Sequence, residues 1–188
     1  SASGSEAFSY TAASGMVVQM LCLPLFTHEM SAVTKVHSSL KIGDILLADR
    51  AFCSFVHLAL LNAAGVFSCF RLHQKRKEQG YNGQRRWERR EKPAWMTAEQ
   101  FAGLPKYLDL RLVSYTLDQK GFRSRRITIA TTLMDQVQWP DARIAELYGH
   151  RWQIEECFRQ LKTHMKMNVL RCRTLDGVMK ELAAYLLV

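Results

Sequence analysis

Residues 45–70 read ILLADRAFCSFVHLALLNAAGVFSCF and contain two short apolar runs on either side of a helical pattern. The first run ends at Asp49, and the second spans residues 66–70. Apolar side chains recur at three- and four-residue spacing over residues 52–64, which predicts a helix, and Gly65 is a typical C-terminal stop. A strand, a helix and a second strand with tight connections predict parallel strands in one sheet that is covered by helices.

The length and composition of the chain limit its class. With 188 residues, 48% of them hydrophobic, the chain can form one domain or part of a larger one, and disorder is not expected. The longest apolar run, residues 16–26, is shorter than the ~20 residues that a membrane span needs, and no basic segment precedes it as in a signal peptide. The sequence stops at Val188 inside an apolar helical pattern, from which we expect a fragment.

The cysteines predict neither a disulfide framework nor a zinc site. There are five, at positions 22, 53, 69, 157 and 172, and none forms a CxxC pair. Cys69 and His73 would be a metal pair only with further ligands, so buried free thiols in a reducing compartment are the preferred interpretation.

Most of the net charge of +9 lies in one segment, residues 71–92, which has nine Lys or Arg and three Glu. Tyr81 and Trp87 lie within it. A positive segment with interspersed aromatic rings is typical of a surface that binds a polyanion such as nucleic acid. The alternative is a solvated loop whose charge only aids solubility.

The second half of the chain is predicted to contain a hairpin and a long helix. Two β-rich runs, residues 110–117 and 124–133, flank a turn at residues 118–121. Pro140 and Asp141 then introduce a helical pattern over residues 142–165, with Asp141 as its N-cap.

Two carboxylates have settings that suit catalysis. Asp49 closes an apolar strand, where open α/β sheets place reactive groups, although it is equally placed to cap the following helix. On the long helix, Tyr148, Arg151, Glu155 and Lys162 fall within an arc of about 60° beside the apolar stripe. One acid with two bases suits metal-dependent phosphoryl transfer, whereas the alternative is a surface ion pair between Arg151 and Glu155.

These residues resemble a known family. The spacing Tyr148-x2-Arg151-x3-Glu155-x6-Lys162 is similar to the Y-(2)-R-(3)-E-(6)-K signature of transposases of the insertion-sequence-four family. The segment GDILLADRAF at residues 43–52 resembles the strand that bears that family's second catalytic aspartate. Further similar segments are FRLH at 70–73, HRWQIE at 150–155 and VLRCRT at 169–174, so the resemblance extends from about residue 8 to the C-terminus.

The resemblance implies an α/β, ribonuclease H-like fold, a mixed sheet flanked by helices, with a β-rich insertion before the catalytic helix. The expected divisions are residues 1–70 for the first part of the core, 71–140 for the basic and β-rich insertion, and 141–188 for the catalytic and C-terminal helices. In such enzymes an Asp-Asp-Glu triad binds two Mg²⁺ or Mn²⁺ ions. By position, Asp49 is the second acid and Glu155 the third, while Tyr148, Arg151 and Lys162 contact DNA near the scissile phosphate.

The sequence departs from the family at the first aspartate. No Asp precedes Asp44, which lies in a turn, and Glu6 lies in a Ser/Gly-rich segment where no strand is expected. We therefore expect that the first catalytic strand is missing and that the chain is inactive by itself. Some relatives also hold a flipped base with a Trp in the last strand of the insertion, and residues 125–133 contain none, so a hairpin intermediate stays open.

The sequence thus predicts the catalytic-domain fragment of a bacterial DNA transposase that is cytoplasmic and associated with the nucleoid, without a membrane contact. The expected partners are double-stranded DNA and a second copy of the chain in a synaptic homodimer. Arg85, Arg86, Arg89 and Arg90 are expected to bind the DNA backbone. The alternatives are a metal-dependent nuclease of the same fold and a non-catalytic DNA-binding or oligomerisation module derived from a transposase.

Overall fold

The computed structural model describes residues 5–10, 17–23, 34, 37–117, 125–152, 156, 159, 163, 171–172, 174, 176–177, 180–181 and 184. The chain divides into two compact units. One comprises residues 37–149, and the other comprises residues 1–36 together with residues 150–188.

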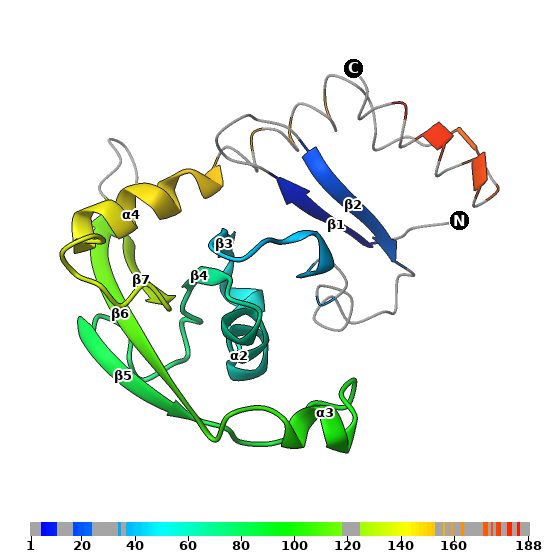
Figure 1. Cartoon of the computed structure of the whole chain (residues 1–188). Coiled ribbons are helices and arrows are strands. Elements are labelled where there is room, and N and C mark those ends of the chain that lie inside the picture. Colours follow the sequence, from blue (N-terminus) through cyan, green and yellow to red (C-terminus); the bar gives the residue numbers. More distant parts are fainter. Residues whose placement is uncertain are drawn as a thin grey trace. The chain divides into compact units, whose positions relative to one another are not determined.

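A five-stranded mixed sheet forms the centre of the unit at residues 37–149, in the order β3-β4-β7-β6-β5 (Figure 1). Strands β3 (Ile45–Ala48) and β4 (Phe67–Arg71) are parallel and are connected through helix α2 (Phe55–Ala63). This arrangement confirms the strand, helix and strand predicted over residues 45–70. It also confirms a mixed α/β fold of the kind expected for a ribonuclease H-like domain.

The remaining strands extend the sheet beyond β4. Strands β5 (Gly83–Glu88), β6 (Tyr107–Leu117) and β7 (Arg125–Thr131) pair antiparallel with their neighbours. The predicted hairpin is therefore confirmed as β6 and β7, and its expected turn lies outside the described residues. Because β5 falls within the basic segment 71–92, this segment is not simply a solvated loop.

Helix α2 begins later than the sequence predicts. A short 3₁₀ helix, η2 (Arg50–Phe52), follows β3, and α2 starts only after Ser54. The extended Ser54 accepts a hydrogen bond from the backbone N–H of His57 at 3.2 Å, which satisfies one of the free amides of the first turn. At the other end Gly65 has a φ of 71°, a left-handed conformation that suits glycine and stops the helix as predicted.

The two faces of the sheet bury separate apolar clusters. Leu110 and Leu112 on β6 share one cluster with Leu58 and Leu61 of α2, whereas the alternate residue Val113 belongs to the other. That second cluster contains Ile144 and Tyr148 of helix α4 (Asp141–Gly149). Because successive side chains of a strand point to opposite faces, α2 and α4 cover opposite sides of the sheet.

Two short elements complete this unit: the 3₁₀ helix η1 (His37–Ser39) and helix α3 (Ala98–Ala102). Thr97 and Gln100 form a reciprocal capping box at the start of α3. None of the helices among the described residues is long and apolar enough to cross a membrane.

The other unit contains an antiparallel pair, β1 (Ser5–Tyr10) and β2 (Val17–Leu23). Strand β2 lies within the apolar run at residues 16–26. The expectation that Glu6 lies outside any strand was wrong, because Glu6 pairs with Cys22 in this ladder. The local Ser/Gly composition has low strand propensity, but pairing with an apolar neighbouring strand outweighs it.

Candidate functional site at the carboxyl end of β3

Asp49 directly follows β3 and does not cap a helix. Its backbone is extended, with φ −76° and ψ 172°, and its side chain makes no capping hydrogen bond to η2. Helix α2 instead has Ser54 as its N-cap. The interpretation of Asp49 as the cap of the following α-helix was therefore wrong, because η2, Cys53 and Ser54 separate it from α2.

One carboxylate oxygen of Asp49 is buried without a partner. Oδ1 is inaccessible to solvent and has no hydrogen-bond partner among the described residues. Leaving a buried acceptor unsatisfied costs on the order of 1–3 kcal/mol, and a water or an ion can fill such a position. Carboxylate oxygens are preferred ligands of Mg²⁺ and Mn²⁺, so Asp49 fits the metal that the sequence predicts.

The chain after β4 also reaches this end of the sheet. Ala48 lies opposite Phe70 in the parallel ladder, so the residues that follow both strands emerge at the same edge. Arg50 Nη1 donates to Gln74 Oε1 at 2.6 Å, which ties the segment after β3 to the segment after β4. Asp49 thus occupies a locally fixed position where parallel strands end.

Tyr148 brings α4 to the same end of β3. Its side chain is only 4% exposed, and it packs in a cluster that includes Ile45 and Leu47 of β3. The Tyr148 hydroxyl donates to the carbonyl oxygen of Ala48 at 3.3 Å, across 100 positions of sequence. The first residue of the predicted signature is therefore adjacent to the peptide group that joins Ala48 to Asp49.

The rest of the signature is described only in part. Helix α4 ends at Gly149, His150 forms a turn, and Arg151 and Trp152 are helical again. The prediction of one unbroken helix from residue 142 was therefore wrong at this point, where glycine weakens helical propensity. Glu155 and Lys162 lie outside the described residues, and Arg151 belongs to the other unit, so the convergence of Asp49 with Glu155 stays a prediction.

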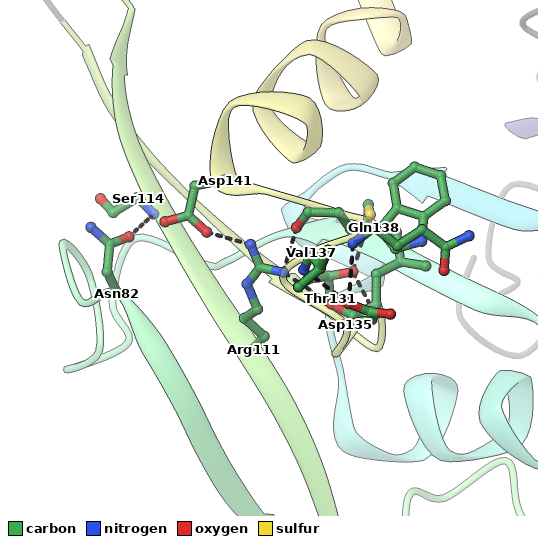
Figure 2. Close-up of polar contacts among 11 residues, drawn as sticks. Asn82, Arg111, Ser114, Thr131, Asp135, Val137, Gln138 and Asp141 are labelled. Carbon is green, nitrogen blue, oxygen red and sulfur yellow. Dashed lines mark hydrogen bonds and ion pairs between the residues drawn. The ribbon is translucent and has the colours of Figure 1, made fainter.

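A buried arginine that the sequence did not predict holds the start of α4. Arg111 on β6 is 1% exposed and pairs through Nη2 with Oδ1 of Asp141. Its Nη1 donates to the carbonyl oxygens of Trp139, at 2.6 Å, and Leu133, at 3.4 Å (Figure 2). Asp141, predicted as an N-cap, is instead the first residue of α4 and the ionic partner of Arg111.

The loop between β7 and α4 is ordered by its own side chains. Oδ1 of Asp135 accepts backbone N–H groups from Val137 at 2.9 Å and Gln138 at 3.1 Å (Figure 2). These contacts present the Trp139 carbonyl to Arg111. Residues 135, 137, 138 and 139 therefore belong to a loop whose conformation is fixed by hydrogen bonds.

The four arginines expected at DNA have different surroundings. The guanidinium of Arg85 stacks on the ring of Tyr81, 3.5 Å from its centroid. Arg86 forms a two-pronged ion pair with Asp109, and this hydrogen bonding lowers the pKa of Asp109 and raises the pKa of Arg86. Arg89 Nη1 donates to the carbonyls of Phe101 and Leu104, whereas Arg90 is exposed.

Trp87 and the cysteines have structural surroundings. Trp87 is 6% exposed in the core cluster, and the guanidinium of Arg76 lies 4.5 Å from its ring centroid. Cys53 and Cys69 are buried free thiols, as predicted, and burial raises their pKa to about 12 and about 11. The prediction was wrong for Cys172, which is a free but exposed thiol. No group of three metal-binding side chains occurs among the described residues, and Cys69 contacts Thr131 Oγ1 at 3.1 Å.

Comparison with known proteins identifies a family. The family model described as the transposase DDE domain matches residues 10–188. No curated protein matches the chain. The matched range includes β3 with Asp49, α4 with Tyr148 and the segment that contains Glu155.

Proposed function

This chain belongs to the transposase DDE domain family, and we propose that it is the catalytic domain of an insertion-sequence-four type enzyme that cleaves transposon-end DNA and joins it to a target. The observation that supports this most strongly is the buried Oδ1 of Asp49 at the end of a parallel strand, which has no hydrogen-bond partner in the part of the chain that the structure describes. A buried carboxylate oxygen without a protein partner suits a metal ligand better than a structural acid.

We assign the metal site to Asp49 and Glu155. Two Mg²⁺ or Mn²⁺ ions held by such carboxylates would supply activation of the attacking hydroxyl and stabilisation of the leaving oxygen. Arg151 and Lys162 would bind the phosphates on either side of the scissile bond, Arg151 as a planar fork and Lys162 as a point charge. These cations would also orient the DNA strand for in-line attack.

A third carboxylate must complete the site. No Asp precedes Asp44 in these 188 residues, and Oδ2 of Asp44 already accepts the backbone N–H of Lys41 at 2.8 Å in a turn. The outer edge of β3 has no partner strand among the residues that the structure describes. We infer that the 188-residue chain binds metal weakly and does not cleave DNA by itself.

The basic segment on and around β5 would hold the DNA backbone. Of the four arginines, Arg85 and Arg90 are exposed and form no ion pair among the residues that the structure describes, whereas Arg86 pairs with Asp109 and Arg89 donates to backbone carbonyls. All four arginines add positive potential at this edge of the sheet. Replacing Arg85 and Arg90 by Gln should lower the slope of log affinity against log salt by about two.

The biological setting follows from the proposed substrate. Joining two transposon ends to one target requires two active sites, so we propose a homodimer in the DNA complex and a location at the bacterial nucleoid. A chain that binds DNA but no metal would instead be a non-catalytic module, and the missing third acid is the observation that favours this second candidate.

Metal titration tests the proposal and separates these candidates. Mn²⁺ broadens amide resonances of nearby residues, so it should broaden those of Asp49 and Arg50 in the whole chain. Asp49→Asn and Glu155→Gln should each abolish the effect, whereas Asp109→Asn, an exposed acid on β6, should leave it unchanged. An unaffected spectrum in the wild-type chain would exclude a catalytic remnant.

DNA cleavage tests the inferred inactivity and the type of enzyme. The purified chain should leave a transposon-end duplex intact in Mg²⁺ or Mn²⁺. Nicking that disappears in Glu155→Ala would overturn the inferred inactivity. With such activity, transfer of a pre-cut end into a second duplex would distinguish a transposase from a simple nuclease.

A further inference from the structure

The peptide group before Asp49 is held from outside its own sheet. Its carbonyl oxygen belongs to Ala48, and the donor is the hydroxyl of Tyr148 on α4, at 3.3 Å. Because the Ala48 carbonyl and the Asp49 nitrogen are parts of one planar peptide, a hydrogen bond to the oxygen restrains the plane from which the Asp49 side chain extends.

The Tyr148 ring is itself fixed. It is 4% exposed and packs in the same cluster as Ile144, one turn earlier on α4, and as Cys69 and Ile129 of the neighbouring strands. A buried aromatic ring with an occupied hydroxyl has little freedom to rotate toward solvent.

The helix that bears Tyr148 is also anchored at its beginning. Arg111 pairs with Asp141 in the first turn of α4 and binds the Trp139 carbonyl just before it (Figure 2). The first turn is thereby attached to β6, and the last turn is attached to β3 through Tyr148. Because α4 is held at both ends, the Tyr148 hydroxyl in its last turn has a well-defined position.

We propose that Tyr148 is a positioning residue that orients the Asp49 carboxylate toward its metal. The inference rests on the proposed function, because it assumes that Asp49 binds the metal. This role adds to the expected contact of Tyr148 with DNA near the scissile phosphate, which stays a prediction. The side chain is 4% exposed, and its hydroxyl donates to the Ala48 carbonyl in the absence of DNA.

The test uses Tyr148→Phe in the whole chain, which removes the hydroxyl and keeps the packed ring. Tyr115→Phe is the matched control, because Tyr115 on β6 packs against the same cluster. Its ladder partner is Ile127 on β7, so it does not adjoin the strand that ends at Asp49. Both variants should unfold at the wild-type temperature within a few degrees, since each loses only a hydroxyl.

Two measurements report on the position of Asp49. The first, in metal-free protein, is the chemical shift of the Ala48 carbonyl carbon and the Asp49 amide nitrogen, which should move in Tyr148→Phe and stay constant in Tyr115→Phe. The second is the Mn²⁺ concentration that half-broadens the Asp49 amide, which should rise about three- to tenfold in Tyr148→Phe alone.

The outcomes are distinguishable. Unmoved Ala48 and Asp49 resonances in Tyr148→Phe would overturn the inference, because the hydrogen bond would then have no effect on this peptide. Moved resonances with an unchanged Mn²⁺ titration would also overturn it, while the proposed function would survive. Wild-type protein without any Asp49-dependent broadening would reject the proposed function and the inference together.

Discussion

Replacing Asp141 by Ala tests the anchoring of α4, because it removes the ionic partner of a buried arginine. The Arg111 side chain is 2% exposed and the Asp141 side chain is 59% exposed. Removing one partner from a fully buried pair costs roughly 3–5 kcal/mol, since the remaining charge stays buried. Here solvent reaches Asp141, and two carbonyls still accept from Arg111, so we expect a smaller loss of about 2 kcal/mol.

The matched control is Asp109→Ala on the same strand. Asp109 also forms an ion pair with an arginine, Arg86, but the two side chains are 55% and 65% exposed. Exposed pairs of this kind contribute little to stability, because water screens the two charges. The difference between the two alanine variants therefore isolates the effect of burying the arginine.

Urea denaturation, followed by far-ultraviolet circular dichroism, gives the free energies. A loss of about 2 kcal/mol corresponds to a decrease of roughly 4–8 °C in the unfolding temperature for a domain of this size. In the background of Arg111→Met, the Asp141→Ala change should cost well under 1 kcal/mol, because no buried charge is left to stabilise. Equal losses in the Asp141 and Asp109 variants would refute the reasoning.

Three further perturbations follow from named contacts. Burial lowers the pKa of His57 from 6.5 to about 4, and His37 Nε2 and the Phe52 carbonyl face its ring nitrogens. Between pH 6.5 and 4 the unfolded chain protonates this histidine while the folded chain does not, so about 3 kcal/mol of the stability present above pH 6.5 is lost as the pH falls toward 4. Denaturation at stepped pH should show this loss. An equal loss in His57→Phe would contradict its assignment to His57. Arg89→Ala should cost about 1–2 kcal/mol, because carbonyls at the end of α3 and just after it lose a charged donor. Arg90→Ala should leave stability unchanged and weaken binding to a short duplex, and the reverse pattern would refute these roles. Asp49→Asn should raise the unfolding free energy of the metal-free protein by about 0.5–1 kcal/mol and abolish Mn²⁺ binding. A destabilised variant would contradict the interpretation that the buried Oδ1 of Asp49 has no compensating partner.

Local patterns predicted the part of the fold that local interactions specify. The alternation of apolar runs, the helical spacing of residues 55–63 and the left-handed Gly65 were enough for β3, α2 and β4. The helix start was misplaced because Phe52 fits the apolar spacing, although the extended Ser54 provides the cap. Apolar periodicity does not report where the backbone leaves the helical region.

The missed features depend on partners distant in sequence. Arg111 lies in a β-rich run and gives no local signal of burial, because its acceptors are 22 to 30 positions later. The strand at Ser5–Tyr10 is specified by its ladder with β2 rather than by its composition. Arg89, which was expected to bind DNA, has the polar surroundings of a surface residue in sequence but binds carbonyls 12 and 15 positions away.

The candidate site shows the same division between local and distant information. Asp49 was found from its place at the end of an apolar strand, and the spacing of Tyr148 with Arg151 indicated its family. The spacing could not indicate that the Tyr148 ring is buried and that its hydroxyl binds the peptide of Asp49. A residue of the family signature can therefore serve to position the neighbouring acid and not only to contact the substrate. This distinction is testable with variants, because a positioning tyrosine that loses its hydroxyl weakens metal binding in DNA-free protein, whereas a tyrosine that only contacts a phosphate weakens DNA binding and leaves metal binding unchanged.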